Sequence, residues 1–256
     1  GWVGDPGLHE LVSSHLIKVP FENVSKLLRP DGAPQLPALE DFLRGIADQD
    51  LGGTCFAIAG HFVSLLQFLD YDAELLAADS GGVPRTHAVI RVRHEGATYL
   101  VDVGYAAPFY HPISVEGPFP LTIPHGDINY VIDRHVAHRE ALEVSTLHGG
   151  AKLTSYVAKP PAVDLDGFAA SIERSCAPDA RFMRRLRIVR FFASRVLEID
   201  NNRLITTHHN ITTVTPIANV DELEAIVHEG LQLPRMPVRE AVEALYARGV
   251  DIFASP

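Results

Sequence analysis

The chain has 256 residues, of which 46% are hydrophobic and 21% charged, and its formal net charge at pH 7 is -10. This is the composition of a globular protein with room for one large domain or two to three small ones. The acidic balance argues against a nucleic-acid partner, and no apolar run is long enough for a membrane-spanning helix. Residues 1–6 lack the features of a secretory signal, and two cysteines argue against a disulfide framework. We therefore expect no nucleic-acid and no membrane partner, and a cytoplasmic location.

Helical patterns dominate the first 78 residues. Apolar residues at helical spacing predict a helix that begins at residue 8, and residues 36–50 predict an amphipathic helix with Pro37 in its first turn. The apolar run at 57–69 is too long for a strand and predicts a buried helix. We expect residues 1–78 to form a helical domain.

Cys55 stands just before the third of these helices. The preceding Gly52 and Gly53 favour a tight turn, because glycine carries no Cβ. A helix N-terminus has a partial positive charge that favours thiolate over thiol. A single cysteine beside an apolar run is, however, usually a small buried hydrophobic residue. Cys176 has no histidine pattern nearby and is interpreted as structural.

A β-hairpin is predicted where residues 87–93 and 98–103 form two strands around a turn that contains Gly96. If residues 95 and 96 form the loop, His87 lies opposite Gly104 and diagonal to Asp102. If residues 94 and 95 form it, His87 lies directly opposite Asp102. In both registers His87 and Asp102 share one face of the hairpin, whereas a three-residue loop would separate them.

Cys55, His87 and Asp102 together have the chemistry of a nucleophile, a base and a residue that orients the base. His87 would take the thiol proton, and Asp102 would fix its tautomer. The structural alternatives stay open on this evidence, since a histidine at a strand start is usually a surface residue and an aspartate before a glycine usually forms a turn.

Four segments carry a resemblance to a known family. They are residues 19–23 (Val-Pro-Phe-Glu-Asn), 52–56 (Gly-Gly-Thr-Cys-Phe), 86–89 (Thr-His-Ala-Val) and 101–105 (Val-Asp-Val-Gly-Tyr). In this order and at about this spacing they resemble motifs of the arylamine N-acetyltransferases, over roughly residues 8–235.

The resemblance implies a catalytic triad of Cys55, His87 and Asp102, and transfer of an acetyl group from acetyl-coenzyme A to an arylamine or hydrazine through an acyl-enzyme. It implies an α+β fold with a helical bundle, a β-barrel-like domain and an α/β lid, built around a cysteine-protease-like Cys-His-Asp core. It also implies substrate-binding roles for a small group of residues: Phe21, Gly104, Tyr105 and Phe109.

The middle of the chain reads as short strands with turns. Residues 79–86 are interpreted as a plain loop, because the spacing of a phosphate-binding glycine loop is absent. Strands are predicted at 128–133, 141–146 and 153–158. We expect residues 79–165 to form the barrel domain that carries His87 and Asp102.

Residues 166–256 are expected to form the lid with a helical extension. Residues 164–192 look helical in part, and strands are predicted at 195–199 and 203–207, followed by helices at 220–230 and 238–248. Five arginines between 181 and 190 form a basic patch. We interpret it as a solvated helix face; the alternative is a contact for the nucleotide end of coenzyme A or for an acidic carrier protein.

No metal site is expected. His208 and His209 should point to opposite faces of a strand, and His135 and His138 lack further ligands at suitable spacing. The implied co-substrate is acetyl-coenzyme A or another acyl thioester. The implied partners are a small-molecule amine and acyl-coenzyme A, with an acyl carrier protein as the alternative donor.

Three departures from the family pattern bear on the substrate. The family usually has Arg where Leu51 stands and Glu where Ala57 stands, and it pairs the carboxylate at Glu22 with an N-terminal Arg, whereas the first Arg here is Arg29. Loss of both charges around the nucleophile is tolerable if they normally pair. Two other functions therefore stay open: an amide synthase that uses a carrier-bound acyl thioester, and a Cys-His-Asp amidohydrolase. A binding module without catalysis would leave the triad unused.

Overall fold

A computed structural model describes residues 7–30 and 35–254, so residues 1–6, where no secretory signal is expected, lie outside the described residues. The chain divides into two compact units. One comprises Gly1–Lys18 and Ala59–Phe168, and the other comprises Val19–Ile58 and Ala169–Pro256. The described chain has no helix long and apolar enough to cross a membrane. The three-domain division at residues 78 and 165 stays a prediction, although residue 78 falls inside a strand, β2 (Asp72–Ser80).

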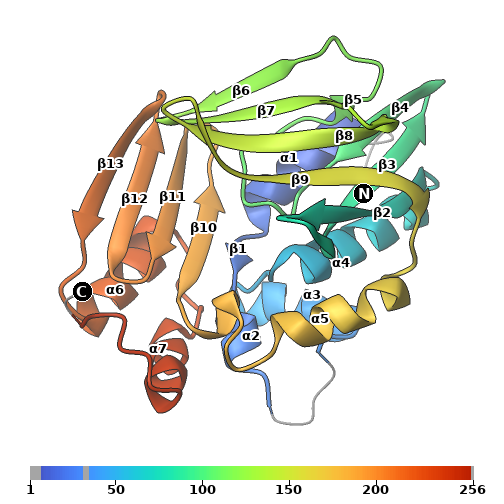
Figure 1. Ribbon diagram of the computed structural model, residues 1–256. Coiled ribbons are helices and arrows are strands. Elements are labelled where there is room, and N and C mark those ends of the chain that lie inside the picture. The colour runs from blue at the N-terminus through green and yellow to red at the C-terminus, as the bar shows by residue number, and fades with distance from the viewer. Residues whose placement is uncertain (1–6, 31–34, 255–256) are drawn as a thin grey trace. The chain divides into compact units, whose positions relative to one another are not determined.

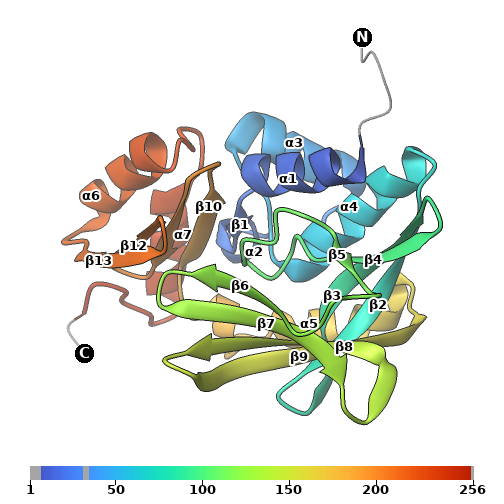
Figure 2. The same ribbon diagram turned by 90° about the horizontal axis from the view of Figure 1, so that it is seen from above.

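The first unit is built on an eight-stranded antiparallel sheet in the order β5-β4-β3-β2-β9-β8-β7-β6, which curls as a partial barrel (Figures 1 and 2). The strands besides β2 are β3 (Val83–His94), β4 (Ala97–Val101), β5 (Ile113–Ser114), β6 (Leu121–His125), β7 (Ile128–His135), β8 (His138–His148) and β9 (Ala151–Ala162). The unit also holds α1 (Leu8–Lys18) and most of α4 (Cys55–Phe68). Strands β3, β7 and β8 contribute apolar side chains to one core, in which Val89, Ile132 and Val144 have no exposed surface.

The second unit has a five-stranded antiparallel sheet in the order β1-β10-β11-β12-β13. Its strands are β1 (Phe21–Glu22), β10 (Arg187–Phe191), β11 (Arg195–Asp200), β12 (Arg203–His208) and β13 (Ile211–Pro216). Its helices are α2 (Val24–Leu27), α3 (Leu39–Gln49), α5 (Ala169–Ser175), α6 (Val220–Ala225), which continues as a π-helix over Ile226–Gly230, and α7 (Val238–Ala247). Short 3₁₀ turns, Leu165–Phe168 in the first unit and Arg181–Met183 in the second, complete the described elements.

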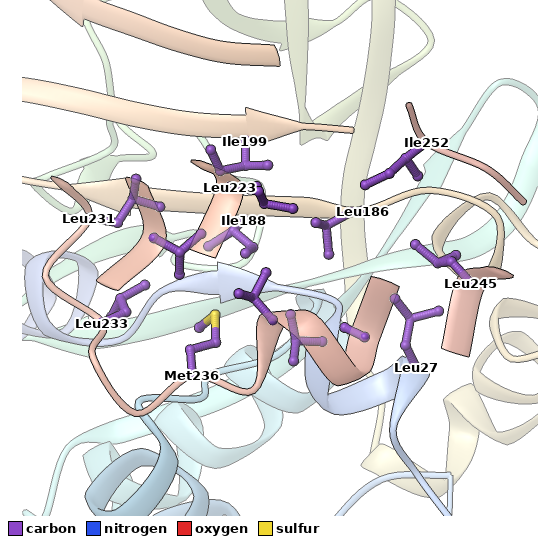
Figure 3. Close-up of a cluster of buried hydrophobic side chains, with 14 of the residues drawn as sticks. Leu27, Leu186, Ile188, Ile199, Leu223, Leu231, Leu233, Met236, Leu245 and Ile252 are labelled. Atoms are coloured by element: carbon purple, nitrogen blue, oxygen red, sulfur yellow. The ribbon is translucent and has the colours of Figure 1, made fainter. Parts of the chain in front are cut away.

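The core of the second unit lies between its sheet and its C-terminal helices (Figure 3). Ile188 and Ile199 project from β10 and β11 onto Leu223 and Leu245, and none of the four has exposed surface. Burying a side chain of this size contributes about 1.5–3 kcal/mol of transfer free energy. The C-terminal helix is therefore part of this unit's core rather than a loose extension.

Most predicted elements are confirmed, and three details are wrong. Pro37 lies before the first turn of its helix, which begins at Leu39. The plain loop at 79–86 is a hairpin instead, in which Gly81 and Gly82 turn between β2 and β3 with positive φ. Residues 187–191, expected to continue a partly helical region, form strand β10 and pair with both β1 and β11.

Candidate active site

The turn before Cys55 has no room for a side chain at Gly52. A Cβ there would lie 1.9 Å from the carbonyl oxygen of Pro20, a distance that two non-bonded atoms cannot occupy. The backbone of Phe21 bridges to Gly53, whose carbonyl accepts a hydrogen bond from Glu22 N–H at 3.0 Å. The predicted need for glycine is confirmed, and its cause is the close approach of residues 19–23. Cys55 is the first residue of α4 and is partly accessible.

Glu22 fastens this turn with its side chain. Its Oε1 accepts a hydrogen bond from Gly52 N–H at 3.0 Å and its Oε2 accepts one from Ser25 N–H at 2.8 Å, while the residue has no exposed surface. Burial raises the pKa of Glu22, and these hydrogen bonds oppose the rise. The family's arginine partner is thus replaced by backbone N–H groups, with Arg29 acting electrostatically from the end of α2.

Lys26 is a residue that the sequence analysis missed. It is 8% exposed, and its Nζ donates to the carbonyl oxygen and hydroxyl of Ser175 at 2.9 and 2.8 Å. Burial lowers the pKa of Lys26, and a negative charge on the sulfur of Cys176 or Cys55 would oppose that shift. The signal in the sequence was a lysine flanked by the apolar residues Val24 and Leu27.

His87 and Asp102 meet as predicted in the first unit. The hairpin pairs His94 with Ala97 and Ile90 with Val101, so the loop is Glu95-Gly96 and the diagonal register is confirmed. His87 Nε2 lies 2.8 Å from Asp102 Oδ2, and the side chains are 8% and 0% exposed. This bond orients the imidazole and makes Nδ1 the ring nitrogen that can serve as a base.

Asp102 accepts two further hydrogen bonds, one of them from a residue that the sequence analysis missed. Gly104 N–H donates to Oδ1 at 3.0 Å, and the hydroxyl of Tyr156 donates to Oδ2 at 2.7 Å. Tyr156 is 1% exposed, and burial raises its pKa well above the usual value, with the Asp102 charge adding to the rise. Its hydroxyl therefore stays a donor. No local pattern links the two residues, because Tyr156 lies on β9.

Of the predicted substrate-binding residues, three lie in the first unit and one lies in the second. In the first unit Tyr105 lies 5.5 Å from the His87 ring and stacks on Phe109 at 6.3 Å, while Phe109 is 1% exposed in the core. Gly104 supports Asp102 through its N–H. In the second unit Phe21 is 5% exposed and packs edge-on against Phe182. Their binding roles stay predictions.

Two of the five arginines in the basic patch form ion pairs: Arg185 pairs with Asp200 at 2.5 Å and Arg187 with Glu198 at 2.9 Å. Arg181 and Arg184 are exposed. Arg187 and Arg190 lie on β10, and only Arg181 lies in the short 3₁₀ turn, so the expected helix face is wrong. Among the described residues no three histidine, cysteine or acidic side chains are grouped to hold a metal ion.

Comparison with known proteins places this geometry in a family. A family model for N-acetyltransferases matches residues 6–236. Among curated proteins, the proansamycin X synthase of Amycolatopsis mediterranei is 34% identical over 118 residues, which are 43% of this chain and 45% of that protein. An arylamine N-acetyltransferase of Mycolicibacterium smegmatis is 34% identical over 128 residues, 45% of this chain and 46% of that protein. These matches span about half the length of each relative.

The fold is shared over the whole chain. The solved structure of Mycobacterium marinum arylamine N-acetyltransferase in complex with CoA covers 97% of this chain and 94% of its own, with a TM-score of 0.77 and 20% sequence identity. The chain therefore has the α+β fold of the solved arylamine N-acetyltransferase structures. Because the family model matches nearly the whole chain, the protein belongs to the arylamine N-acetyltransferase family.

Proposed function

We propose that the protein is an acyltransferase that moves an acyl group, acetyl in the first instance, from a coenzyme A thioester to the nitrogen of an arylamine or a similar amine. The observation that carries the proposal is the buried hydrogen bond between His87 and Asp102. It occurs in a family fold whose nucleophile motif has Cys55 at a helix N-terminus. The CoA complex of the M. marinum protein supports the choice of donor.

The proposed reaction has two displacement steps. His87 takes the Cys55 proton at Nδ1, and the thiolate attacks the acyl carbon of the thioester; the coenzyme A thiol leaves with a proton, and an acyl-enzyme remains. The amine then attacks the acyl carbon, gives its proton to His87, and releases Cys55. Asp102 holds the imidazole in the tautomer that both steps need.

The acyl-enzyme must be protected from water before the amine arrives. Phe21, Tyr105 and Phe109 are the aromatic residues to which we assign this role, together with acceptor binding. Gly104 is assigned the support of Asp102 in addition to substrate contact. The mechanism uses no metal, and it needs a reduced thiol, for which the cytoplasm is the expected compartment.

A second candidate is an amide synthase that takes its acyl group from a carrier protein. The observation in its favour is the match to proansamycin X synthase, which has the same 34% identity as the match to the M. smegmatis acetyltransferase. Leu51 and Ala57 replace the charges usual in the family beside the nucleophile, so the acyl group or the amine can differ from that of an ordinary arylamine acetyltransferase.

Intact-mass analysis after incubation with acetyl-coenzyme A tests the proposal. We expect one acetyl adduct on the native protein and on Cys176→Ala, no adduct on Cys55→Ala, and discharge on addition of an arylamine. An adduct from an acyl carrier thioester but not from coenzyme A would favour the amide synthase. Discharge to water faster than to any amine would favour an amidohydrolase, and an adduct that persists in Cys55→Ala would overturn the proposed nucleophile.

A further inference from the structure

Two exposed histidines of the first unit lie close to each other. His9 lies in the first turn of α1, and His111 lies in the segment between β4 and β5. Their Nδ1 atoms are 3.5 Å apart, and both side chains are exposed. The two residues are 102 positions apart in the chain, so the sequence alone does not predict that they are close together.

The separation of these nitrogens suits a shared metal ion. A hydrogen bond from a ring N–H usually spans about 2.7–3.2 Å, so 3.5 Å is long for one. Two imidazole nitrogens that each bind a zinc ion at about 2.0–2.1 Å in tetrahedral geometry lie roughly 3.4 Å apart. The observed distance is close to that value.

The His9 and His111 rings are also inclined to one another rather than stacked. A nitrogen lone pair lies in the plane of its imidazole, and the His9 and His111 rings are inclined by 46° with centroids 5.5 Å apart. The other histidine pairs differ. The rings of His135 and His138 are inclined by only 14°, and those of His208 and His209 by 24°. Stacked rings hold their in-plane lone pairs in separate, nearly parallel planes, so one ion cannot lie in both planes.

The backbones that carry the pair are anchored. His9 follows the buried Leu8, and Tyr99 packs against the His9 ring edge-on at 6.5 Å. His111 stands two residues after the buried Phe109 and two before the buried Ile113. A metal site needs ligands held on such supported positions. Because both rings are exposed, a hydrated ion can reach them and keep water at its remaining positions.

We propose that His9 and His111 form a binding site for a divalent transition-metal ion, with imidazole Nδ1 ligands from both residues and water completing the coordination. Imidazole favours zinc, nickel and copper over magnesium and calcium, and copper(II) should bind most tightly of the first-row divalent ions. With two protein ligands the ion should exchange readily. This proposal does not rest on the proposed acyl transfer.

Copper(II) binding tests the proposal on untagged protein whose two thiols have been alkylated with iodoacetamide, which removes them as competing ligands. We expect one equivalent to bind, with an electron paramagnetic resonance spectrum showing two imidazole nitrogens. His9→Ala and His111→Ala should each weaken binding about tenfold or more and lower the nitrogen count. A His135→Ala/His138→Ala double variant is the matched control and should bind as the native protein does.

Zinc provides a second measurement without redox chemistry. Calorimetric titration should give one site on the alkylated native protein, and saturating zinc should raise its melting temperature but not that of His9→Ala or His111→Ala, because the ion binds only the folded pair. Circular dichroism verifies that these exposed substitutions leave the fold intact. Affinity and spectra that are the same in the native protein and both single variants would overturn the proposal, as would binding lost only in the control.

Discussion

Removal of one hydroxyl group, in Tyr156→Phe, tests how the Asp102 carboxylate is supported. Asp102 has a fully buried side chain and accepts hydrogen bonds from His87, Gly104 and Tyr156. Phenylalanine keeps the ring in the core and deletes only the 2.7 Å bond to Oδ2. Since Tyr156 is 1% exposed, water cannot easily replace the lost donor.

The expected loss of unfolding free energy is large because the acceptor, the Asp102 carboxylate, is charged. A hydrogen bond to a charged group contributes about 1.5–3 kcal/mol, against about 0.5–1.5 kcal/mol for a neutral pair. We therefore expect Tyr156→Phe to lower the free energy of unfolding by about 2 kcal/mol. Tyr105→Phe is the matched control, because its hydroxyl bonds the neutral hydroxyl of Thr146 at 2.9 Å and its ring lies 4.9 Å from that of Tyr156. That variant should lose about 1 kcal/mol.

Urea unfolding followed by circular dichroism measures both variants, and mass spectrometry of the acetylated protein gives the rate of Cys55 acylation. Because the His87–Asp102 bond remains in Tyr156→Phe, acylation should slow far less than in Asp102→Asn, which disturbs the histidine tautomer. Equal stability of Tyr156→Phe and native protein, within about 0.5 kcal/mol, would refute the reasoning. A larger loss in Tyr105→Phe than in Tyr156→Phe would do the same.

Three further changes follow from the described contacts. Gly52→Ala should sharply reduce Cys55 alkylation by iodoacetamide, because its Cβ would lie 1.9 Å from Pro20 O, and native-like alkylation would contradict this. Glu22→Gln retains only one acceptor for two buried N–H groups, so urea unfolding should show a loss of about 1–3 kcal/mol, and an unchanged midpoint and slope would disprove that account. Burial lowers the pKa of His15 from 6.5 to about 4. The unfolded chain therefore takes up a proton first as the pH falls. Between pH 7 and pH 5 the free energy of unfolding should drop by about 2 kcal/mol more in the native protein than in His15→Phe, and parallel pH curves for the two would rule the linkage out.

The sequence was most informative for the hairpin, where the length of one loop determines which residues of the two strands face each other. A two-residue loop determines which residues face each other throughout the hairpin, so counting placed His87 and Asp102 on one face, and the structure selected the register with the loop at Glu95-Gly96. The nucleophile motif was equally local, because the glycine turn and the helix that begins at Cys55 are adjacent in the chain.

The parts that escaped prediction depend on contacts between distant segments. Tyr156 reaches Asp102 from 54 residues away, and Lys26 reaches Ser175 from 149 residues away. Strand β10 was missed because Arg187 and Arg190 obscure the alternation of its apolar residues, and their role is clear only once Arg187 pairs with Glu198 on β11. The spacing of residues in the sequence does not predict such contacts between distant segments.

The departures around the nucleophile can be understood from what now holds its turn. Leu51 packs against the core of the second unit, and a Cβ on Gly53 would come within 2.9 Å of Ala57, so both replaced positions are occupied by apolar contacts rather than by one stranded charge. Replacing a buried ion pair by packed apolar groups is often neutral for stability.

Two other polar contacts position the same segment. Glu22 bonds Gly52 N–H, and Arg235 binds the carboxylate of Asp50 at 2.5 Å and also donates to the carbonyl of Ala47. Asp50 ends α3 with a positive φ of 52°, so this ion pair fixes the chain direction just before the glycine turn. The turn that presents Cys55 is thus supported without the Arg and Glu usual in the family. Loss of these two charges therefore changes the surroundings of the thiol and leaves its backbone in place. For this reason we attribute the departure to the choice of acyl group or amine rather than to loss of the nucleophile.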